Sequence, residues 1–141
     1  MVPTARLEPI LSRVAKPARY AGGEFNACRK DPQTVKLRFC LVFPDVYEVG
    51  MSSLGFQIIY HAINSRDDAY CERAFTPWGD MEQEMRSAGV PLYTLETRTS
   101  LQEMDAIGFS IGSEATYTNV LTCLDLAGVP LRSEHRTERS P

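Results

Sequence analysis

The sequence has no closely spaced pair of cysteines. Its four cysteines, Cys28, Cys40, Cys71 and Cys123, are all more than three residues apart. Zinc ribbons and iron–sulfur sites usually draw on at least one close pair, so the sequence predicts no metal site. A disulfide framework is not expected either, because a chain with 43% hydrophobic residues can form an ordinary apolar core. We therefore expect reduced, mostly buried thiols in a cytoplasmic protein.

Long apolar runs and a basic excess are missing as well. No stretch reaches the roughly 18 apolar residues of a membrane span, and the N-terminus has no apolar segment of the secretory type. The net charge of −3 does not provide the basic surface that nucleic-acid phosphates require. The length of 141 residues suits one domain. We therefore expect no membrane partner and no direct nucleic-acid partner.

Hydrophobic patterning divides the chain into three parts. Residues 1–34 are expected to form an N-terminal arm with a helix over 6–14, residues 35–131 an α/β domain, and residues 132–141 a disordered tail. Strands are predicted at 35–43, 70–75 and 106–111, with a further short strand at 92–95. Helices are predicted at 51–65, 79–88 and 114–127. This alternation is typical of a three-layer, Rossmann-like parallel sheet with right-handed crossovers.

Two of these helices carry apolar stripes that we expect to face the sheet. The helix at 51–65 has Ser52 or Ser53 as a natural N-cap. Its predicted buried stripe consists of Leu54, Ile58, Ile59, Ala62 and Ile63. The predicted inward residues of the helix at 114–127 are Tyr117, Val120, Leu121 and Leu124.

Two loops follow strands and lead into helices, at residues 45–50 and 110–114. Ligands of open α/β sheets bind beyond the carboxyl ends of the strands, and the N–H groups of a helix N-terminus can receive a polar group. From geometry alone, the commoner role is structural, with Asp45 in a turn and Ser113 as a helix cap. The sequence has no Gly-rich phosphate loop and no convincing nucleophile–base pair, so no catalytic residue is predicted.

Two further features have a structural and a functional interpretation. Trp78 beside Pro77 could stack on a ligand, but a large aromatic residue more often packs in the core. Glu96 and Arg98 could form an exposed ion pair or a domain contact, and exposed pairs contribute little to stability.

The motifs in the two loops resemble a known family. Asp45-x-Tyr47-x-x-Gly50 resembles the Asp-x-His-x-x-Gly loop of cobalamin-binding domains, and Ser110-x-Gly112 lies where that fold places a Ser-x-Leu segment. The stretch 43–52 is similar to the N-terminal domain of a radical SAM family with a cobalamin-binding-like module. Segments at 19–26, 77–82, 95–99 and 117–128 are similar to that family in the same order, so the resemblance covers about residues 19–132.

The resemblance implies a function as well as a fold. It implies a cobalamin-binding or flavodoxin-like sheet, a cobalamin cofactor, and a radical SAM catalytic domain as partner, in cis or in trans. The 4Fe–4S cluster and S-adenosyl-L-methionine would belong to that catalytic domain alone. The cofactor-binding residues that the resemblance implies are Asp45, Tyr47, Gly50, Ser52, Ser110, Gly112 and Ser113.

Three departures from the family pattern leave alternatives open. Tyr47 replaces the histidine that supplies the lower ligand of cobalt, and a protonated phenol is a poor ligand. Cobalamin would then be held without a protein nitrogen, or not at all. The sequence shows three clear strands, and its only Gly-Gly pair, Gly22-Gly23, precedes the first of them, so we expect an incomplete sheet. The Cys-x-x-x-Cys-x-x-Cys loop of radical SAM barrels is absent, so we expect the barrel to lie outside this chain.

Two hypotheses of function follow. In the first, the chain is the N-terminal cobalamin-binding-like module of a radical SAM protein and either positions a corrinoid or docks on the catalytic barrel. In the second, it is a structural or protein-interaction domain that has lost cobalamin binding. A receiver domain of the response-regulator type is disfavoured, because Ser110 and Ile111 occupy the place of the phosphorylatable aspartate.

Overall fold

The computed structural model describes residues 1–137 and 140–141. Residues 138–139, part of the tail that the sequence predicts to be disordered, lie outside the described residues. The strands are β1 (Leu37–Phe43), β2 (Ala69–Phe75) and β3 (Ala106–Phe109). The α-helices are α1 (Thr4–Leu11), α2 (Ala18–Ala21), α3 (Tyr47–Met51), α4 (Leu54–Asn64), α5 (Gly79–Ala88) and α6 (Tyr117–Ala127). The 3-10 helices are η1 (Leu101–Glu103), η2 (Glu114–Thr116) and η3 (Ser133–His135).

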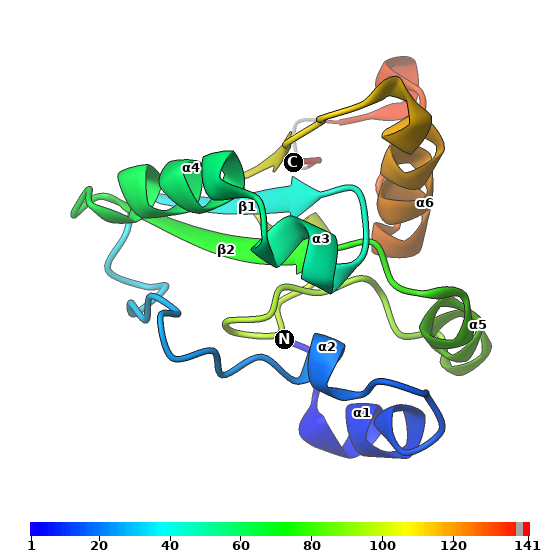
Figure 1. Cartoon of the computed structure of the whole chain (residues 1–141). Coiled ribbons are helices and arrows are strands. Elements are labelled where there is room, and N and C mark those ends of the chain that lie inside the picture. Colours follow the sequence, from blue (N-terminus) through cyan, green and yellow to red (C-terminus); the bar gives the residue numbers. More distant parts are fainter. Residues whose placement is uncertain (138–139) are drawn as a thin grey trace.

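The strands form one parallel sheet in the order β2-β1-β3 (Figure 1). The central strand is β1, whose Leu41 is opposite Arg73 of β2 and Gly108 of β3. Its run of apolar residues is the pattern of a strand that is covered on both faces. The predicted α/β class, with an open and incomplete Rossmann-like parallel sheet, is confirmed.

Helices cover both faces of the sheet, because successive side chains of β1 point to opposite faces. On one face, Leu41 packs in a buried cluster with Phe56 of α4. On the other face, Val42 packs in a second cluster with Met81 of α5 and Cys123 of α6. Figure 1 shows α4 above β1 and β2, and α5 on the opposite side of the sheet.

The N-terminal segment belongs to the second cluster. Leu7 and Ile10 of α1, and Val14 beyond it, are buried in the cluster that contains Met85 of α5. α1 also contacts α5 directly. The first residues therefore contribute apolar side chains to the core, where Leu7 and Ile10 share a cluster with Met85 of α5. The helix predicted at 6–14 is observed as Thr4–Leu11, so it ends three residues before the predicted end.

The two outer strands of the sheet differ in how their free edges are covered. All seven residues of β2 are buried, and the backbone N–H of Leu95 donates to the carbonyl of Arg73, which closes that edge. The prediction of a short strand at 92–95 is wrong. Within the described residues, this segment forms only an isolated bridge between Tyr93 and Ser100. All four residues of β3 are only half-buried. Within the described part of the chain, β3 pairs with β1 alone.

The predicted buried stripe of α4 is wrong. Its buried residues are Phe56 and Tyr60, whereas Leu54, Ile58 and Ile59 are 73%, 58% and 43% exposed. The two aromatic side chains are one turn apart and fill the space above β1 and β2, so they fix the rotation of the helix. Of the predicted stripe, Ile63 packs against this cluster, and Leu54, Ile58 and Ile59 are left exposed on the outer side of the helix.

The predicted inward face of α6 needs a similar correction. Its buried residues are Cys123, Leu126 and Ala127. Tyr117 and Leu121, which were expected to face inward, are 58% and 50% exposed. Within the described residues the sheet ends at β3, and no strand lies beneath this side of α6.

Helix ends follow local chemistry. The Oγ of Ser53 accepts from the backbone N–H of Phe56, which identifies Ser53 as the N-cap of α4. α5 ends at Gly89 and α6 at Gly128, both in the left-handed conformation that favours glycine. No helix in the described residues is long and apolar enough to cross a lipid bilayer.

Candidate functional site: a crevice at the carboxyl ends of β1 and β3

The two loops singled out by the sequence meet at one end of the sheet. A cavity of about 190 Å³ lies between the carboxyl ends of β1 and β3. In the order β2-β1-β3, the second and third strands are added on opposite sides of β1, so the strand order reverses between β1 and β3, which is the usual ligand position in open α/β sheets. The lining residues are Phe43, Pro44, Asp45, Val49, Ser110, Gly112, Ser113 and Thr116. Four predicted site residues, Asp45, Ser110, Gly112 and Ser113, are thus brought together.

Asp45 is held in a turn that joins the ends of two strands. Its Oδ1 accepts from the backbone N–H of Val46 at 2.7 Å, and its backbone carbonyl accepts from the N–H of Thr76, just beyond β2. These bonds fix the carboxylate at the rim of the crevice. The structural role expected of Asp45 from its position is therefore present alongside its place in the cavity wall.

The second wall of the crevice is built by the turn that opens η2. The Oγ of Ser113 accepts from the N–H of Ala115 at 3.3 Å, and its carbonyl accepts from the hydroxyl of Thr116 at 2.7 Å. The N–H of Ser110 donates to the carbonyl of Val42, which continues the pairing between β1 and β3. A Cβ on Gly112 would meet no atom within 4 Å, so packing does not require glycine there.

The other three predicted site residues lie outside this cavity. The ring of Tyr47 packs edge-on against Phe75, with ring centroids 5.4 Å apart. Burial and the nearby carboxylate of Glu24 raise the pKa of Tyr47, so its hydroxyl is a neutral group. The Oγ of Ser52 donates to the carbonyl of Glu48. A Cβ on Gly50 would lie 2.3 Å from a ring carbon of Phe75, so this glycine permits close packing of α3.

A second cavity of about 420 Å³ adjoins the first, and Asp45 lines both. Its other lining residues are Val46, Thr76, Pro77, Trp78, Gly79 and Asn119. Trp78 was expected to pack in the core, but it is 58% exposed, with the guanidinium of Arg19 at 5.6 Å from its ring. Asn119 was not predicted. Its side-chain amide donates to the carbonyl of Pro44 at 2.9 Å. Its position in the first turn of α6, next to the loop at 110–114, is the feature of the sequence that could have identified it.

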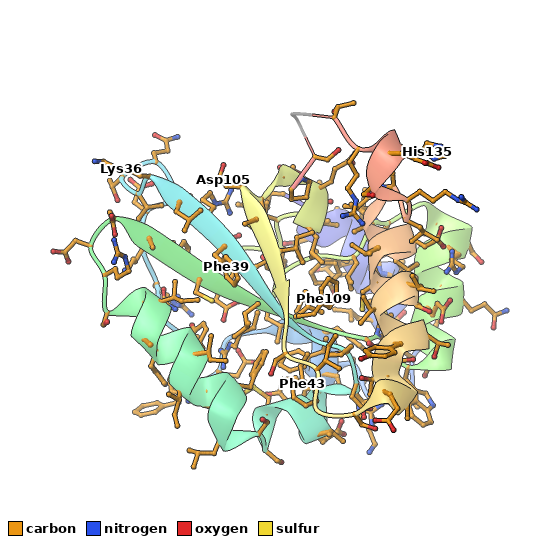
Figure 2. The ribbon with its side chains drawn as sticks, turned by 90° about the horizontal axis from the view of Figure 1, so that it is seen from above. Lys36, Phe39, Phe43, Asp105, Phe109 and His135 are labelled. Atoms are coloured by element: carbon orange, nitrogen blue, oxygen red, sulfur yellow. The ribbon has the colours of Figure 1, made fainter. Side chains whose placement is uncertain are left out.

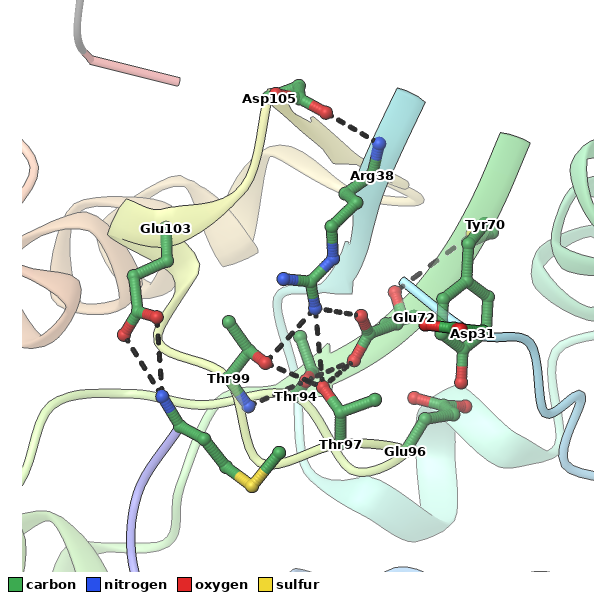
Figure 3. A network of polar contacts seen from close by, with 12 residues as sticks. Asp31, Arg38, Tyr70, Glu72, Thr94, Glu96, Thr97, Thr99, Glu103 and Asp105 are labelled. Carbon is green, nitrogen blue, oxygen red and sulfur yellow. Dashed lines mark hydrogen bonds and ion pairs between the residues drawn. The ribbon is translucent and has the colours of Figure 1, made fainter. Parts of the chain in front are cut away.

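A buried network of charges lies away from the crevice, along β2 (Figure 3). Arg38 of β1 donates to Glu72 at 2.6 Å, and the hydroxyls of Thr94 and Thr97 also donate to Glu72. Glu96 pairs with Arg73 rather than with Arg98. Arg98 instead donates to Thr4 and to the carbonyl of Ala21.

These carboxylates are occupied by partners within the protein, so the network is structural. It holds the segment around residues 94–99 against β2. Within the described residues, no group of three or more His, Cys, Asp or Glu side chains could hold a metal ion.

Comparison with known proteins gives one match. The family model described as "Radical SAM proteins, N-terminal" matches residues 55–141, which is more than half of the chain. No curated protein and no solved structure matches the chain. The matched range contains Ser110, Gly112 and Ser113, and begins after the loop at 45–50.

Proposed function

The chain belongs to the family of N-terminal regions of radical SAM proteins, and from this premise we propose that it is a docking module that associates with a radical SAM catalytic domain and does not itself ligate cobalt. Radical SAM chemistry, with its 4Fe–4S cluster and S-adenosyl-L-methionine, would reside in that catalytic domain. The module would contribute a rigid α/β surface with the crevice at one end.

One observation carries the proposal, namely the position of Tyr47. Its ring packs against Phe75 in the cluster beneath α4, so the loop at 45–50 is anchored to the core. A neutral phenol is a poor metal ligand, and this one does not line the crevice. The residues present therefore do not fit a corrinoid held by a protein ligand at this position.

The corrinoid-binding alternative has one observation in its favour. Asp45, Ser110, Gly112 and Ser113 converge at the carboxyl ends of β1 and β3, where the family resemblance implies a cofactor. The cavity that they line is about 190 Å³, and the adjoining cavity, which Asp45 also lines, is about 420 Å³. The packing of Tyr47 against Phe75, away from the crevice, favours docking over corrinoid binding.

Two measurements on the full chain test the proposal. The first is an absorbance titration with hydroxocobalamin, for which we expect no saturable spectral change. The second is mixing with a radical SAM catalytic polypeptide of the same source, for which we expect a stoichiometric complex in sedimentation velocity. Stoichiometric uptake of hydroxocobalamin would overturn the docking proposal in favour of a corrinoid module. Absence of the complex would overturn it as well.

A further inference from the structure

We propose that a cavity beside β2 binds a doubly charged phosphate, either free or as the monoester of a small molecule. The cavity has a volume of about 400 Å³ and is lined by the segment at 21–30, by Tyr70 of β2 and by the turn at 95–98. We call it the cationic cavity, because three of its lining side chains are positively charged. None of its residues lines the crevice, so the inference goes beyond the docking function and does not depend on it.

The cationic cavity lies apart from the crevice along the sheet. It begins at the amino end of β2, where Tyr70 is the second residue and pairs with Arg38 near the start of β1. Figure 2 shows Lys36 just before the start of β1 and Phe43, which lines the crevice, at the opposite end of that strand. A ligand in the cationic cavity would therefore leave the crevice free.

Cations without an acidic partner gather in this cavity. Most lysine and arginine side chains of the described residues form an ion pair with a carboxylate. The exceptions in that part of the chain are Arg6, Arg29, Lys30, Lys36, Arg98 and Arg136. Three of these, Arg29, Lys30 and Arg98, line the cationic cavity. A chain with a net charge of −3 thus concentrates half of the unpaired positive side chains that the structure describes at one site.

The positions of Lys30 and Arg98 are fixed by neutral acceptors. The Nζ of Lys30 donates to two backbone carbonyls, one of them that of Ala69 at 2.8 Å. The guanidinium of Arg98 donates to the hydroxyl of Thr4 at 2.9 Å and to the carbonyl of Ala21 at 3.4 Å. Such bonds hold a cation in place but leave its charge uncompensated. The cavity is therefore prepared for an anion, because these side chains need not be ordered on binding.

Glu96 is the one acidic residue among the lining residues, and its charge is directed away from the cavity. Both oxygens of its carboxylate accept hydrogen bonds from Arg73, and its side chain is not exposed. The residue as a whole is half-buried, so the part of it that reaches the cavity is its backbone. An anion in the cavity therefore does not face an uncompensated carboxylate.

The backbone brings the two walls together at an energetic cost. Gly22 has a φ of 69°, and a Cβ there would lie 2.2 Å from the carbonyl oxygen of Leu95, so a glycine lets the segment at 21–30 lie on the turn. Arg98 has a φ of 58° and is the one residue other than glycine with a positive φ among those described. Strain of this kind concentrates at functional sites. The strained turn keeps Arg98 in the cavity wall.

The charge and size of the cavity indicate the class of ligand. Three cations match a phosphate monoester, which carries about two negative charges at neutral pH, better than a single carboxylate. Arginine also binds phosphate through two parallel hydrogen bonds. The volume of about 400 Å³ is in the range of small-molecule sites and leaves room for an organic part beside the phosphate. A nucleic acid would require an extended basic face, which one cavity does not provide.

The test is a titration of the isotope-labelled full chain, followed by its amide shifts in two-dimensional NMR. The probes are inorganic phosphate, glycerol phosphate and acetate, which has a single charge. We expect saturable shifts at Gly23, Thr97 and Arg98 with both phosphates, and a dissociation constant of about 1 mM or lower. Acetate should bind at least about tenfold more weakly, because it has one charge fewer to interact with the three cations.

Three variants assign the binding to the cavity. The side chain of Arg29 forms no hydrogen bond or ion pair among the described residues, so Arg29→Gln removes a charge without breaking an internal contact. We expect this variant to weaken phosphate binding about threefold or more, and Arg98→Gln roughly tenfold. The matched control is Arg6→Gln. Arg6 also donates to backbone carbonyls and has no acidic partner among the described residues, but it lies outside the cavity, so this variant should bind phosphate as the wild type does.

Three results would overturn the cationic cavity as a phosphate site. They are the absence of saturable shifts with both phosphates, shifts at Ser110 and Gly112 in place of the cavity residues, and equal weakening in Arg6→Gln and Arg29→Gln. Acetate binding as tight as that of phosphate overturns the class of ligand. Circular dichroism shows whether each variant folds, and Arg29→Gln decides the question alone if Arg98→Gln does not fold.

The two phosphate probes also identify the source of the phosphate. Tighter binding of glycerol phosphate supports a site for a monoester, and tighter binding of inorganic phosphate supports a site for the free ion. No catalytic polypeptide enters these measurements. Their failure would therefore leave the docking function standing, and failure of docking would leave the cationic cavity standing.

Discussion

Arg73 binds the carboxylate of Glu96 through two groups at once. Its Nε donates to Oε1 and its backbone N–H donates to Oε2, both at 2.7 Å, and neither side chain is exposed. The ring of Tyr60 lies 4.3 Å from the guanidinium carbon. Because Glu96 belongs to the segment that covers β2, this pair fastens that segment to the edge of the sheet.

Removing the carboxylate should therefore destabilise the protein strongly. Breaking a buried ion pair by changing one partner leaves an uncompensated charge, which typically costs about 3–5 kcal/mol. Glu24 lies 3.5 Å from the same guanidinium and offsets part of that cost. We expect Glu96→Gln to lower the free energy of unfolding by roughly 3 kcal/mol, as measured by urea denaturation.

The control is an ion pair in solvent. Asp68 pairs with Arg66 at 2.9 Å, with side chains 47% and 64% exposed. We expect Asp68→Asn to change the free energy of unfolding by less than about 1 kcal/mol. Equal effects for the two substitutions would show that the Arg73–Glu96 pair does not hold the covering segment.

Gly50 offers a second test of how the core is packed, because close contact with Phe75 leaves no room for a side chain at this position. A Cβ there would come within 2.3 Å of the Phe75 ring, which itself packs against Phe56 and Tyr47. We expect Gly50→Ala to lower the free energy of unfolding by about 1–3 kcal/mol, the usual cost of overpacking. Denaturant titration followed by circular dichroism measures it.

Gly55 is the matched control for Gly50. It lies in α4, and a Cβ there would meet nothing within 4 Å. Alanine at an unhindered helical position is more favourable than glycine by about 0.5–1 kcal/mol. We therefore expect Gly55→Ala to raise stability slightly. A loss of stability in Gly55→Ala as large as that in Gly50→Ala would contradict the packing explanation.

The rotation of α4 is tested by two truncations on opposite sides of the helix. Phe56 is fully buried and contacts the rings of Phe43 and Phe75. We expect Phe56→Ala to cost about 3–5 kcal/mol. Ile58, 58% exposed, should tolerate alanine within roughly 0.5 kcal/mol. Thermal and urea unfolding of the two variants compare these losses of stability directly. A larger loss for Ile58→Ala than for Phe56→Ala would support the buried stripe predicted from the sequence.

The sequence predicts β1, β2, β3 and α5 well, for physical reasons that act locally. β1 is apolar from Phe39 to Phe43, and α5 has acidic residues in its first turn and Gly89 at its end. The rotation of α4 was not predictable in this way. The aliphatic stripe and the aromatic pair, Phe56 and Tyr60, both repeat at helical spacing, and which side is buried depends on how many strands the sheet contains.

The candidate site shows a similar division. Asp45 and Ser113 were found because they directly follow strands, where parallel sheets place ligands. The separation of Tyr47 from the crevice depends on a contact with Phe75, which is distant in the sequence. The pairing of Glu96 with Arg73 instead of Arg98 likewise requires β2 to lie beside the covering segment. Such non-local contacts leave no periodic signal.

The buried thiols make stability depend on alkaline pH. Burial raises the pKa of Cys71 to about 12 and of Cys123 to about 11, from an ordinary thiol value of 9.0. Burial also raises the pKa of Cys40 well above that value. Between pH 9 and the folded pKa, an unfolded thiol has lost its proton while the folded one retains it. The unfolded state then binds fewer protons, so rising pH favours unfolding.

We therefore expect these thiols to leave the free energy of unfolding unchanged below about pH 8. Above about pH 9 each thiol should lower it by up to roughly 1.4 kcal/mol per pH unit. Urea denaturation at about pH 7, 8, 9, 10 and 11 gives the free energy of unfolding at each pH and therefore its slope. Tyr60, Tyr70 and Tyr93, whose pKa values burial also raises, add to the fall above about pH 10.

The Cys123→Ala variant isolates the contribution of one thiol to this slope. Cys123 lies 3.4 Å from the hydroxyl of Thr76, so the substitution removes a packed group and lowers stability by a similar amount at every pH. The thiol's own titration is a separate effect, because it alters only the dependence on pH between 9 and about 11. We expect a shallower fall in the variant over that interval. Parallel curves for variant and wild type would mean that the thiol ionises equally well in the folded and unfolded states, and that Cys123 is not shielded from water as its place on the buried side of α6 requires.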